Sequence, residues 1–270
     1  MKLRWSVAVV ATLVLLVVVA VCSAQGQNAL DKPGTRAGET ATGPDGGVYV
    51  WVPAGEFMMG AGDDDKHASR FEKPAHRVRI TKGFWLSKCE VTLGQWKTYC
   101  QKVGIAVGEA RASSDDYPVS YVSWDDAGAY CRAYGLALPT EAQWEYAARG
   151  PEGRKYPWGN QWDEDKYSDT GGKGPQDYTF PVGSLPKGNS WCGASDMAGN
   201  VWEWCKDWYG EKYYAESATD DPRGPDNGSQ RVMRGGVWLL DAYFCRCSIR
   251  YYIGPTLRHF LIGCRPSRTP

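Results

Sequence analysis

The sequence predicts a loop-rich α+β fold with a small mixed sheet and few helices. Its 270 residues include 32 Gly and 16 Pro, which is a high share of turn-forming residues. Strand signals are short and end by Ile80, and only three segments carry helix-capping signals. Beyond Gly150 loops dominate, and loops this long need aromatic packing, metal or disulfides to hold them. This part carries Trp158, Trp162, Trp191, Trp202, Trp204 and Trp208, and Trp238 further on.

The first 24 residues predict an export signal. Lys2 and Arg4 precede an apolar run over residues 7–21, which is shorter than the about 20 residues of a membrane span. Cleavage after Ala24 gives a mature protein, whereas lipid attachment at Cys22 gives a lipoprotein; both stay open. We expect the protein at the cell surface, in the outer membrane or in the periplasm. Its contact with the membrane is then through a lipid anchor at Cys22 alone.

A flexible tether is predicted for residues 25–46, followed by a folded domain over residues 47–270. Strands are predicted at 49–52, 57–59 and 76–80. Thr92, Ser123 and Thr140 are expected to cap helices that reach Val103, Tyr134 and Arg149. Export favours disulfides, but buried thiols are an equal alternative for any pair. The eight cysteines concerned are Cys89, Cys100, Cys131, Cys192, Cys205, Cys245, Cys247 and Cys264.

Charge and motifs exclude several function classes. Lys and Arg number 31 and Asp and Glu number 31, so the basic footprint of a nucleic-acid-binding protein is missing. Only three histidines are present, which leaves little for His-based catalysis. The chain has no GxSxG, HExxH, P-loop or GxGxxG motif. We therefore expect no nucleic-acid partner.

Seven sequence blocks occur in an order and spacing that point to one family. They are VPAGEFMMG, CEVT, PVSYVSWDDAGAYC, LPTEAQWEYAARG, YPWGN, DMAGNVWEW and RGG. Together they resemble the formylglycine-generating-enzyme (sulfatase-modifying factor) family over residues 49–265. The resemblance implies a variant of the C-type lectin fold, which agrees with the loop-rich α+β prediction.

The resemblance also bears on metals. The DMAGNVWEW block is similar to a calcium site of the family, and oxygen ligands suit this hard cation. Asp196 and Glu203 would then supply side chains, and Gly199 and Val201 would supply carbonyl groups. The alternative is a hydrogen-bonded Asp–Glu loop without metal.

Oxidases of the family bind copper(I) between the thiolates of a Cys-x4-Cys pair, which soft metals favour. Leu240 stands at the place of the first of these cysteines, and Cys245-Arg246-Cys247 does not reproduce the spacing. We therefore expect no copper and no enzymatic activity.

The segment from about 237 to 264 has an unusual composition. It holds many apolar and aromatic residues at positions where the family has mostly polar ones, and it contains no Lys, Glu, Gln or Met. This pattern resembles the variable region of diversity-generating-retroelement proteins, closest to the spirochaetal variable proteins. Exposed apolar patches mark interaction sites. The expected ligand-binding residues are Val237, Leu239, Leu240, Asp241, Tyr243, Phe244, Tyr251, Tyr252, Ile253, Leu257, His259, Phe260 and Leu261.

We expect an exported, receptor- or adhesin-like protein that displays this variable site to an extracellular protein or other macromolecule. Two alternatives stay open. One is an oxidase or other enzyme of the same family, and the other is a structural or accessory protein of the cell envelope.

Overall fold

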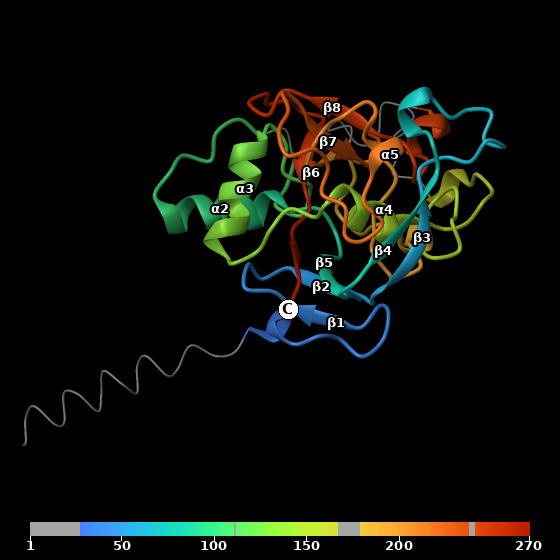
Figure 1. The fold of residues 1–270 in the computed structure, drawn as a ribbon. Coiled ribbons are helices and arrows are strands. Elements are labelled where there is room, and N and C mark those ends of the chain that lie inside the picture. The colour runs from blue at the N-terminus through green and yellow to red at the C-terminus, as the bar shows by residue number, and fades with distance from the viewer. Residues whose placement is uncertain (1–27, 111, 167–178, 238–240) are drawn as a thin grey trace, which may run out of the picture.

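Three small sheets and a few helices make up the fold (Figure 1), and they confirm the predicted loop-rich α+β class. The computed structural model describes residues 28–110, 112–166, 179–237 and 241–270. The predicted export signal, residues 1–24, lies outside them. One sheet, β8-β7-β6-β9, forms one end of the molecule, and the sheet β1-β2-β5-β10 lies toward the other. The pair β6–β9 is parallel and the other pairs are antiparallel, so the sheet β8-β7-β6-β9 is mixed and the other two are antiparallel.

Both ends of the domain contribute a strand to the sheet β1-β2-β5-β10. It consists of β1 (Thr40–Thr42), β2 (Val48–Val52), β5 (Phe84–Ser87) and β10 (Ser267–Arg268). The prediction of a tether over residues 25–46 is wrong for its described part. Thr40 to Thr42 pair with β2, and Leu30 is 0% exposed in the core. Backbone pairing and one buried Leu order a segment that has no apolar periodicity of its own.

The strands predicted next lie in a hairpin. It consists of β3 (Gly55–Met59) and β4 (His76–Ile80), which pair antiparallel. Although β3 follows β2 after two residues, the two strands belong to different sheets. The chain therefore changes sheet at Pro53-Ala54, where the sequence indicates a turn.

The three long helices agree with the capping signals. They are α2 (Leu93–Val103), α3 (Trp124–Ala133) and α4 (Glu141–Arg149). Thr92, Ser123 and Thr140 each accept from a backbone N–H three residues on, and the side chain there returns the bond. Gly150, at φ +69°, ends α4 as expected. Short elements complete the described chain: η1 (Ala29–Asp31), η2 (Arg70–Glu72), η3 (Glu164–Lys166), η4 (Pro186–Gly188), α5 (Tyr213–Glu216) and η5 (Ala242–Cys245).

The C-terminal segment supplies both edge strands of the remaining sheet. This sheet consists of β6 (Trp202–Trp208), β7 (Arg231–Arg234), β8 (Tyr251–Ile253) and β9 (Ile262–Cys264). β8 pairs with β7 on one side, and β9 pairs with β6 on the other. Trp202 and Trp204 belong to one hydrophobic cluster, and Trp144 belongs to a second. The Trp-rich blocks thus supply part of the core of the fold, and the C-terminal segment adds Ile249 and Ile262 to it.

Most cysteines lie in the core as thiols. Cys89, Cys100, Cys131, Cys192, Cys205, Cys247 and Cys264 form no disulfide.

Across the described ranges, every helix is too short or too polar to traverse a lipid bilayer.

Candidate functional site

The inner face of the C-terminal segment is fixed by buried arginines. Arg234, Arg246, Arg250 and Arg265 are all buried. Each one forms an ion pair with a carboxylate from another part of the chain, and Arg250 donates to both Glu141 oxygens at 2.7 and 2.6 Å. A buried guanidinium must be paired in this way, because an unpaired buried charge costs several kcal/mol. These side chains are therefore part of the scaffold, whereas Arg258 is exposed and pairs with Asp126.

Glu141 shows the electrostatic effect of this scaffold. Burial acts to raise the pKa of its carboxyl, but the charges of Arg250 and Arg234 outweigh burial and hold the pKa below its usual value. Arg234 also pairs with Glu145 from the same helix, α4. Helix α4 and strand β7 are thus held together under the C-terminal segment by charges of opposite sign.

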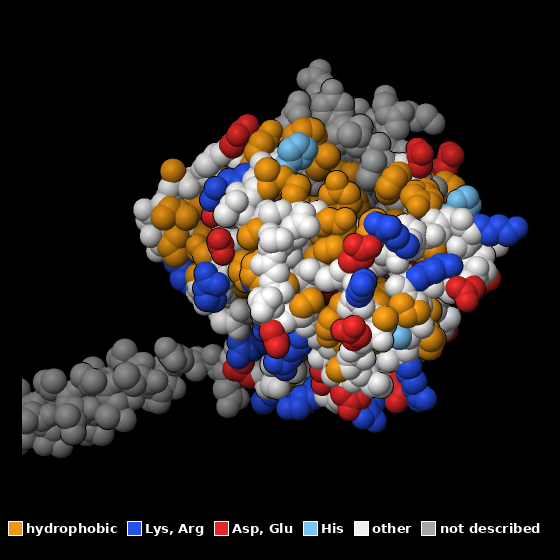
Figure 2. Space-filling view, turned by 45° about the horizontal axis from the view of Figure 1, so that its top comes forward, with side chains coloured by type: hydrophobic (Ala, Val, Ile, Leu, Met, Phe, Trp, Pro, Cys, Tyr) orange, Lys and Arg blue, Asp and Glu red, His pale blue; other side chains and the backbone are white. Residues whose placement is uncertain are grey.

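The outer face of the same segment carries exposed apolar side chains. Tyr251 is 50% exposed and Leu257 is 39% exposed. Tyr251 stacks on Trp202, with ring centroids 5.3 Å apart, and Tyr252 stacks on Tyr209 at 3.6 Å. We call Tyr251, Tyr252, Leu257 and their partners Trp202 and Tyr209 the aromatic surface. Figure 2, in which the end of the molecule with β8 comes forward, shows apolar side chains gathered on this face.

The other predicted binding residues differ in exposure. Asp241 is exposed, whereas Tyr243, Phe244, Ile253, His259, Phe260 and Leu261 are half-buried. Val237 is 1% exposed within the large hydrophobic cluster, so the expectation that it faces solvent is wrong. It directly follows the RGG turn, whose backbone leads the chain inward. Leu239 and Leu240 lie outside the described residues.

Sequence reasoning missed the supporting rings of the aromatic surface. Phe71 packs edge-on against Tyr252, with centroids 5.9 Å apart, and against Tyr209 at 6.4 Å. Outside the aromatic surface, the Tyr121 and Phe260 rings also pack together, with centroids 6.3 Å apart. These contacts join positions far apart in the sequence, so no local pattern indicates them.

Cys245 is a second residue that sequence reasoning undervalued. In a Cys-x4-Cys pair that begins at position 240, position 245 is the second cysteine. Cys245 lies with Ala198 in a small buried cluster against Trp158 and Trp162. Its sulfur sits so close to Gly236 that a Cβ there would be 2.9 Å from it, so the RGG turn and the sulfur fit together only because Gly236 has no side chain. The signal that identifies Cys245 is its spacing from Leu240.

Copper does not fit the described cysteines as a two-thiolate site. Leu240 offers no thiolate, and Cys247 packs in a different hydrophobic cluster from Cys245. The two sulfurs of the Cys-x-Cys sequence thus enter separate parts of the core.

The predicted calcium ligands meet a mixed environment. Both Glu203 oxygens accept from Arg265, at 2.7 and 2.8 Å, and one of them also accepts from the Trp144 indole at 2.7 Å. Glu203 therefore does not fit as a calcium ligand. Asp196 keeps positive φ, +57°, and accepts from the Gly183 N–H at 2.6 Å. In the part of the chain that the structure describes, no three His, Cys, Asp or Glu side chains converge to hold a metal.

Glu90 is the unexpected member of this region. It is fully buried, and both its carboxylate oxygens are without a hydrogen-bond partner. Burial, and after it the charge of Asp196, raise the pKa of Glu90 well above its ordinary value. A cation beside Asp196 would relieve this repulsion, because paired or metal-bound carboxylates tolerate burial.

Comparisons with known proteins agree with this architecture. The sulfatase-modifying factor enzyme 1-like domain matches residues 36–269. The formylglycine-generating enzyme of Streptomyces coelicolor is 31% identical, over 82% of this chain and 84% of that protein. Hercynine oxygenase of Mycobacterium tuberculosis is 30% identical, over 77% of this chain and 58% of that protein.

Two solved structures show the same fold. PvdO from Pseudomonas aeruginosa superposes with a TM-score of 0.79 and 26% identity, over 88% of this chain and all of that one. Treponema denticola variable protein 1 superposes with a TM-score of 0.71 and 25% identity, over 87% of this chain and all of that one. This second likeness supports the resemblance to the treponemal variable proteins.

The comparisons correct one expectation. The missing cysteine pair predicts a protein without enzymatic activity, but the curated relatives include formylglycine-generating enzymes and a hercynine oxygenase. The prediction of a non-enzyme is therefore wrong. It depended on one metal site, whereas the family also includes an enzyme named for a different reaction.

Proposed function

The chain belongs to the sulfatase-modifying factor enzyme 1-like family, and from this membership we propose that it is an oxidising enzyme that binds a peptide or protein substrate on the aromatic surface. The observation that carries the proposal is the state of Tyr251, which is half exposed and yet held in place by its stack on Trp202. An exposed aromatic ring with a fixed position loses little entropy when it binds. The similar enzymes supply the reaction class, an oxidation.

The proposed reaction takes dioxygen as oxidant and two equivalents of an added thiol as reductant, so that the cysteine becomes an aldehyde with release of sulfide, water and a disulfide. It uses no copper held between two thiolates, because Leu240 replaces the first of them. Cys245 remains at the second place, under the RGG turn. The proposed enzyme therefore shares a fold and one cysteine with the formylglycine-generating enzymes, but it does not share their copper site.

The test is an oxygen-uptake and mass-spectrometric assay with a cysteine-containing sulfatase peptide. We expect the wild-type protein to oxidise the peptide equally well with copper added and with copper chelated. Leu240→Cys restores the Cys-x4-Cys spacing with Cys245 and should bind one Cu(I) per chain, whereas Leu240→Ser is its control. Wild-type turnover that requires copper would contradict the copper-free reaction. No oxidation by the wild type in any condition would contradict the enzyme.

A second candidate function is a retroelement-diversified binding site on the same surface. A specific observation favours it: residues 237–264 lack Lys, Glu, Gln and Met, four of the five types that are unreachable when both adenines of an AAC codon vary, and contain the fifth, Trp, only at position 238. The likeness to Treponema denticola variable protein 1 supports it further. A near-copy of the 3′ coding end with AAC codons, beside a reverse-transcriptase gene, is the expected genomic context. Without both, this candidate fails.

We also propose export of the protein and a calcium ion at Asp196 and the carbonyl groups of Gly199 and Val201. Glu90 replaces Glu203 as the second carboxylate, because Glu90 accepts no hydrogen bond and lies 3.9 Å from Arg265, whereas both Glu203 oxygens accept from Arg265. A ligand that binds only the folded state stabilises it by mass action. EDTA should lower the melting temperature, and added calcium should restore it. An unchanged melting temperature together with no calcium by elemental analysis would contradict the site.

A further inference from the structure

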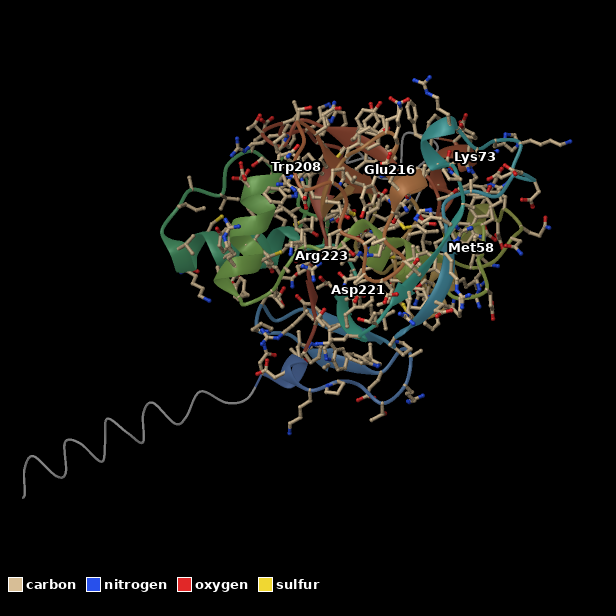
Figure 3. All side chains as sticks on the ribbon, in the orientation of Figure 1. Met58, Lys73, Trp208, Glu216, Asp221 and Arg223 are labelled. Carbon is tan, nitrogen blue, oxygen red and sulfur yellow. The ribbon has the colours of Figure 1, made fainter. Side chains whose placement is uncertain are left out.

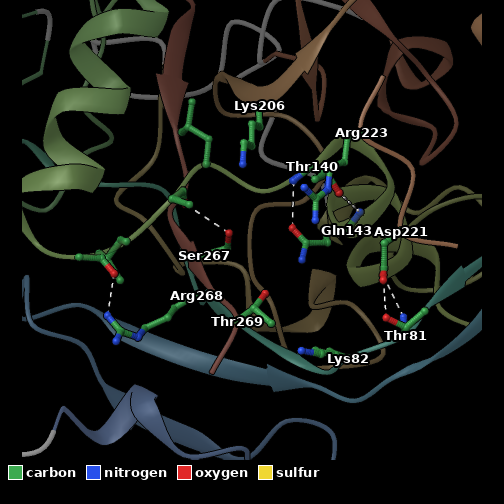
Figure 4. Close-up of a pocket in the computed structure, with 14 residues that line it drawn as sticks. Thr81, Lys82, Thr140, Gln143, Lys206, Asp221, Arg223, Ser267, Arg268 and Thr269 are labelled. Carbon is green, nitrogen blue, oxygen red and sulfur yellow. Dashed lines mark hydrogen bonds between the residues drawn. The ribbon is translucent and has the colours of Figure 1, made fainter. Parts of the chain in front are cut away.

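A basic pocket of about 550 Å³ lies away from the aromatic surface, and Figure 4 shows the 14 residues that line it. It includes Arg268 and Thr269 near the C-terminus, whereas β8 lies at the opposite end of the molecule (Figure 1). Five segments converge on it: the β4–β5 link, the α3–α4 link with the start of α4, strand β6, residues 221–223 and the C-terminal strand. Its charged residues are Lys82, Lys206, Asp221, Arg223 and Arg268.

The positive charges of the pocket outnumber its negative charge. The one carboxylate, Asp221, is engaged by Thr81, whose backbone N–H donates to it at 2.9 Å and whose hydroxyl donates to its other oxygen. Arg268 pairs with Asp31 and donates to the Gly135 carbonyl at 2.6 Å. Within the described ranges, Lys82, Lys206 and Arg223 have no carboxylate at ion-pair distance.

This excess is local, since Lys and Arg balance Asp and Glu over the whole chain. Like charges that share one cavity repel each other, and a bound anion would remove that repulsion. The backbone N–H groups at the start of α4 are not available to bind an anion. The Thr140 N–H donates to the Gln143 side chain at 3.0 Å, and the Glu141 N–H donates to Asp207 at 2.9 Å. Recognition would therefore depend on side chains.

The wall that carries Arg223 is held in place before any ligand binds. The Arg79 N–H donates to the Thr219 carbonyl at 2.7 Å, and the Asp221 N–H donates to the Arg79 carbonyl at 2.9 Å. The Arg79 side chain also pairs with Asp220. Figure 3 shows Asp221 and Arg223 near each other beside strand β4. The pocket is thus a preformed feature of the fold.

The lining also indicates a hydrophilic ligand. Apolar side chains come only from Leu136, Ala137 and Leu138, and hydroxyl groups come from Thr81, Thr140, Ser267 and Thr269. The volume lies in the range of small-molecule sites, about 300–1,000 Å³. A charged oxyanion attached to a hydroxyl-rich body, such as a sugar, matches both features.

We propose that the basic pocket binds a small hydrophilic phosphate or sulfate ester. Lys82, Lys206 and Arg223 contact the oxyanion, and the threonine hydroxyls contact the rest of the molecule. Charged hydrogen bonds of this kind are stronger than neutral ones. The proposal does not depend on the proposed oxidation, because it concerns another face of the protein.

The test is calorimetric titration of the full folded chain with glucose 6-phosphate, glucose 6-sulfate and glucose at low ionic strength. We expect one or both esters to bind and glucose not to bind. A stronger heat from one ester identifies which oxyanion the pocket prefers. Binding should weaken with added salt, since exposed charges are screened.

Variants assign the binding to the pocket. Lys206→Ala and Arg223→Ala should each weaken binding about tenfold, as expected for loss of a charged hydrogen bond, and the double variant should abolish it. Lys212→Ala, an exposed lysine outside the pocket, is the control and should bind as the wild type does. The substituted side chains are exposed, so melting curves should stay unchanged and show that the variants are folded. Binding of neither ester, or equal weakening by Lys212→Ala, would overturn the proposal.

Discussion

At the scale of single residues, Asp207 shows how burial without a paired cation changes a carboxyl group. Its side chain is 3% exposed and accepts the Glu141 N–H at 2.9 Å. Burial and the charge of Glu141 raise the pKa of Asp207 from 3.8 to about 7. Glu141, equally buried, has Arg250 and Arg234 beside it and shifts the other way. Whether an arginine faces the carboxylate decides the direction.

This difference predicts a pH dependence of stability. The unfolded chain releases the Asp207 proton near pH 4, whereas the folded chain keeps it to about pH 7. The folded state therefore loses stability as pH rises from about 4 to 7. Asp207→Asn keeps an acceptor for Glu141 and does not titrate. Urea unfolding should show no difference at pH 4 and a variant more stable by about 1–4 kcal/mol above pH 7. Equal stability at every pH would contradict the raised pKa.

At the scale of elements, the C-terminal segment has an inner and an outer face with different energetic roles. The arginines of the inner face hold the segment on α4 and β7, and Val237 is packed in the core. The rings of β8 stack outward on Trp202 and Tyr209. Side chains of the outer face can change without loss of the fold only if core packing does not depend on them.

The two faces should respond differently to substitution. Tyr251→Ser together with Leu257→Ser should cost less than about 1.5 kcal/mol of unfolding free energy, since both side chains are substantially exposed. Val237→Ser should cost about 2–4 kcal/mol, because it removes buried methyl groups and buries a hydroxyl. Thermal and urea unfolding measure both. A loss from the double variant as large as that from Val237→Ser would show that the aromatic surface is core.

Local signals explain how much of these elements could be predicted. Capping boxes at Thr92, Ser123 and Thr140 lie within four residues of the helices they start, so the helix bounds follow from sequence. The pairing of β1 with β2 and the packing of Phe71 on Tyr252 depend on the folded chain. The basic pocket could not be predicted either, because its lysines and arginines come from separate segments that only the folded chain brings together.

At the scale of the whole molecule, the C-terminus fastens three distant parts of the chain. β10 pairs with β5, the Ser267 N–H donates to the Ala137 carbonyl at 2.7 Å, and Arg268 pairs with Asp31 in η1. The two ends of the described chain thus supply the opposite edge strands of one sheet. These contacts between distant segments predict that the sheet edges do not unfold separately and that the domain unfolds in one transition.

Removal of residues 267–270 tests whether β10 unfolds together with the rest of the domain. The shortened chain loses the β10 ladder, the bond to Ala137 and the Arg268 pair, at about 1 kcal/mol for each hydrogen bond. We therefore expect a loss of about 2–4 kcal/mol, with one transition still seen by both circular dichroism and tryptophan fluorescence. A chain that lacks only Pro270, which is exposed, should melt as the full chain does. If the four-residue deletion left stability unchanged, or if the two probes gave different midpoints, the last strand would not be part of the cooperative unit.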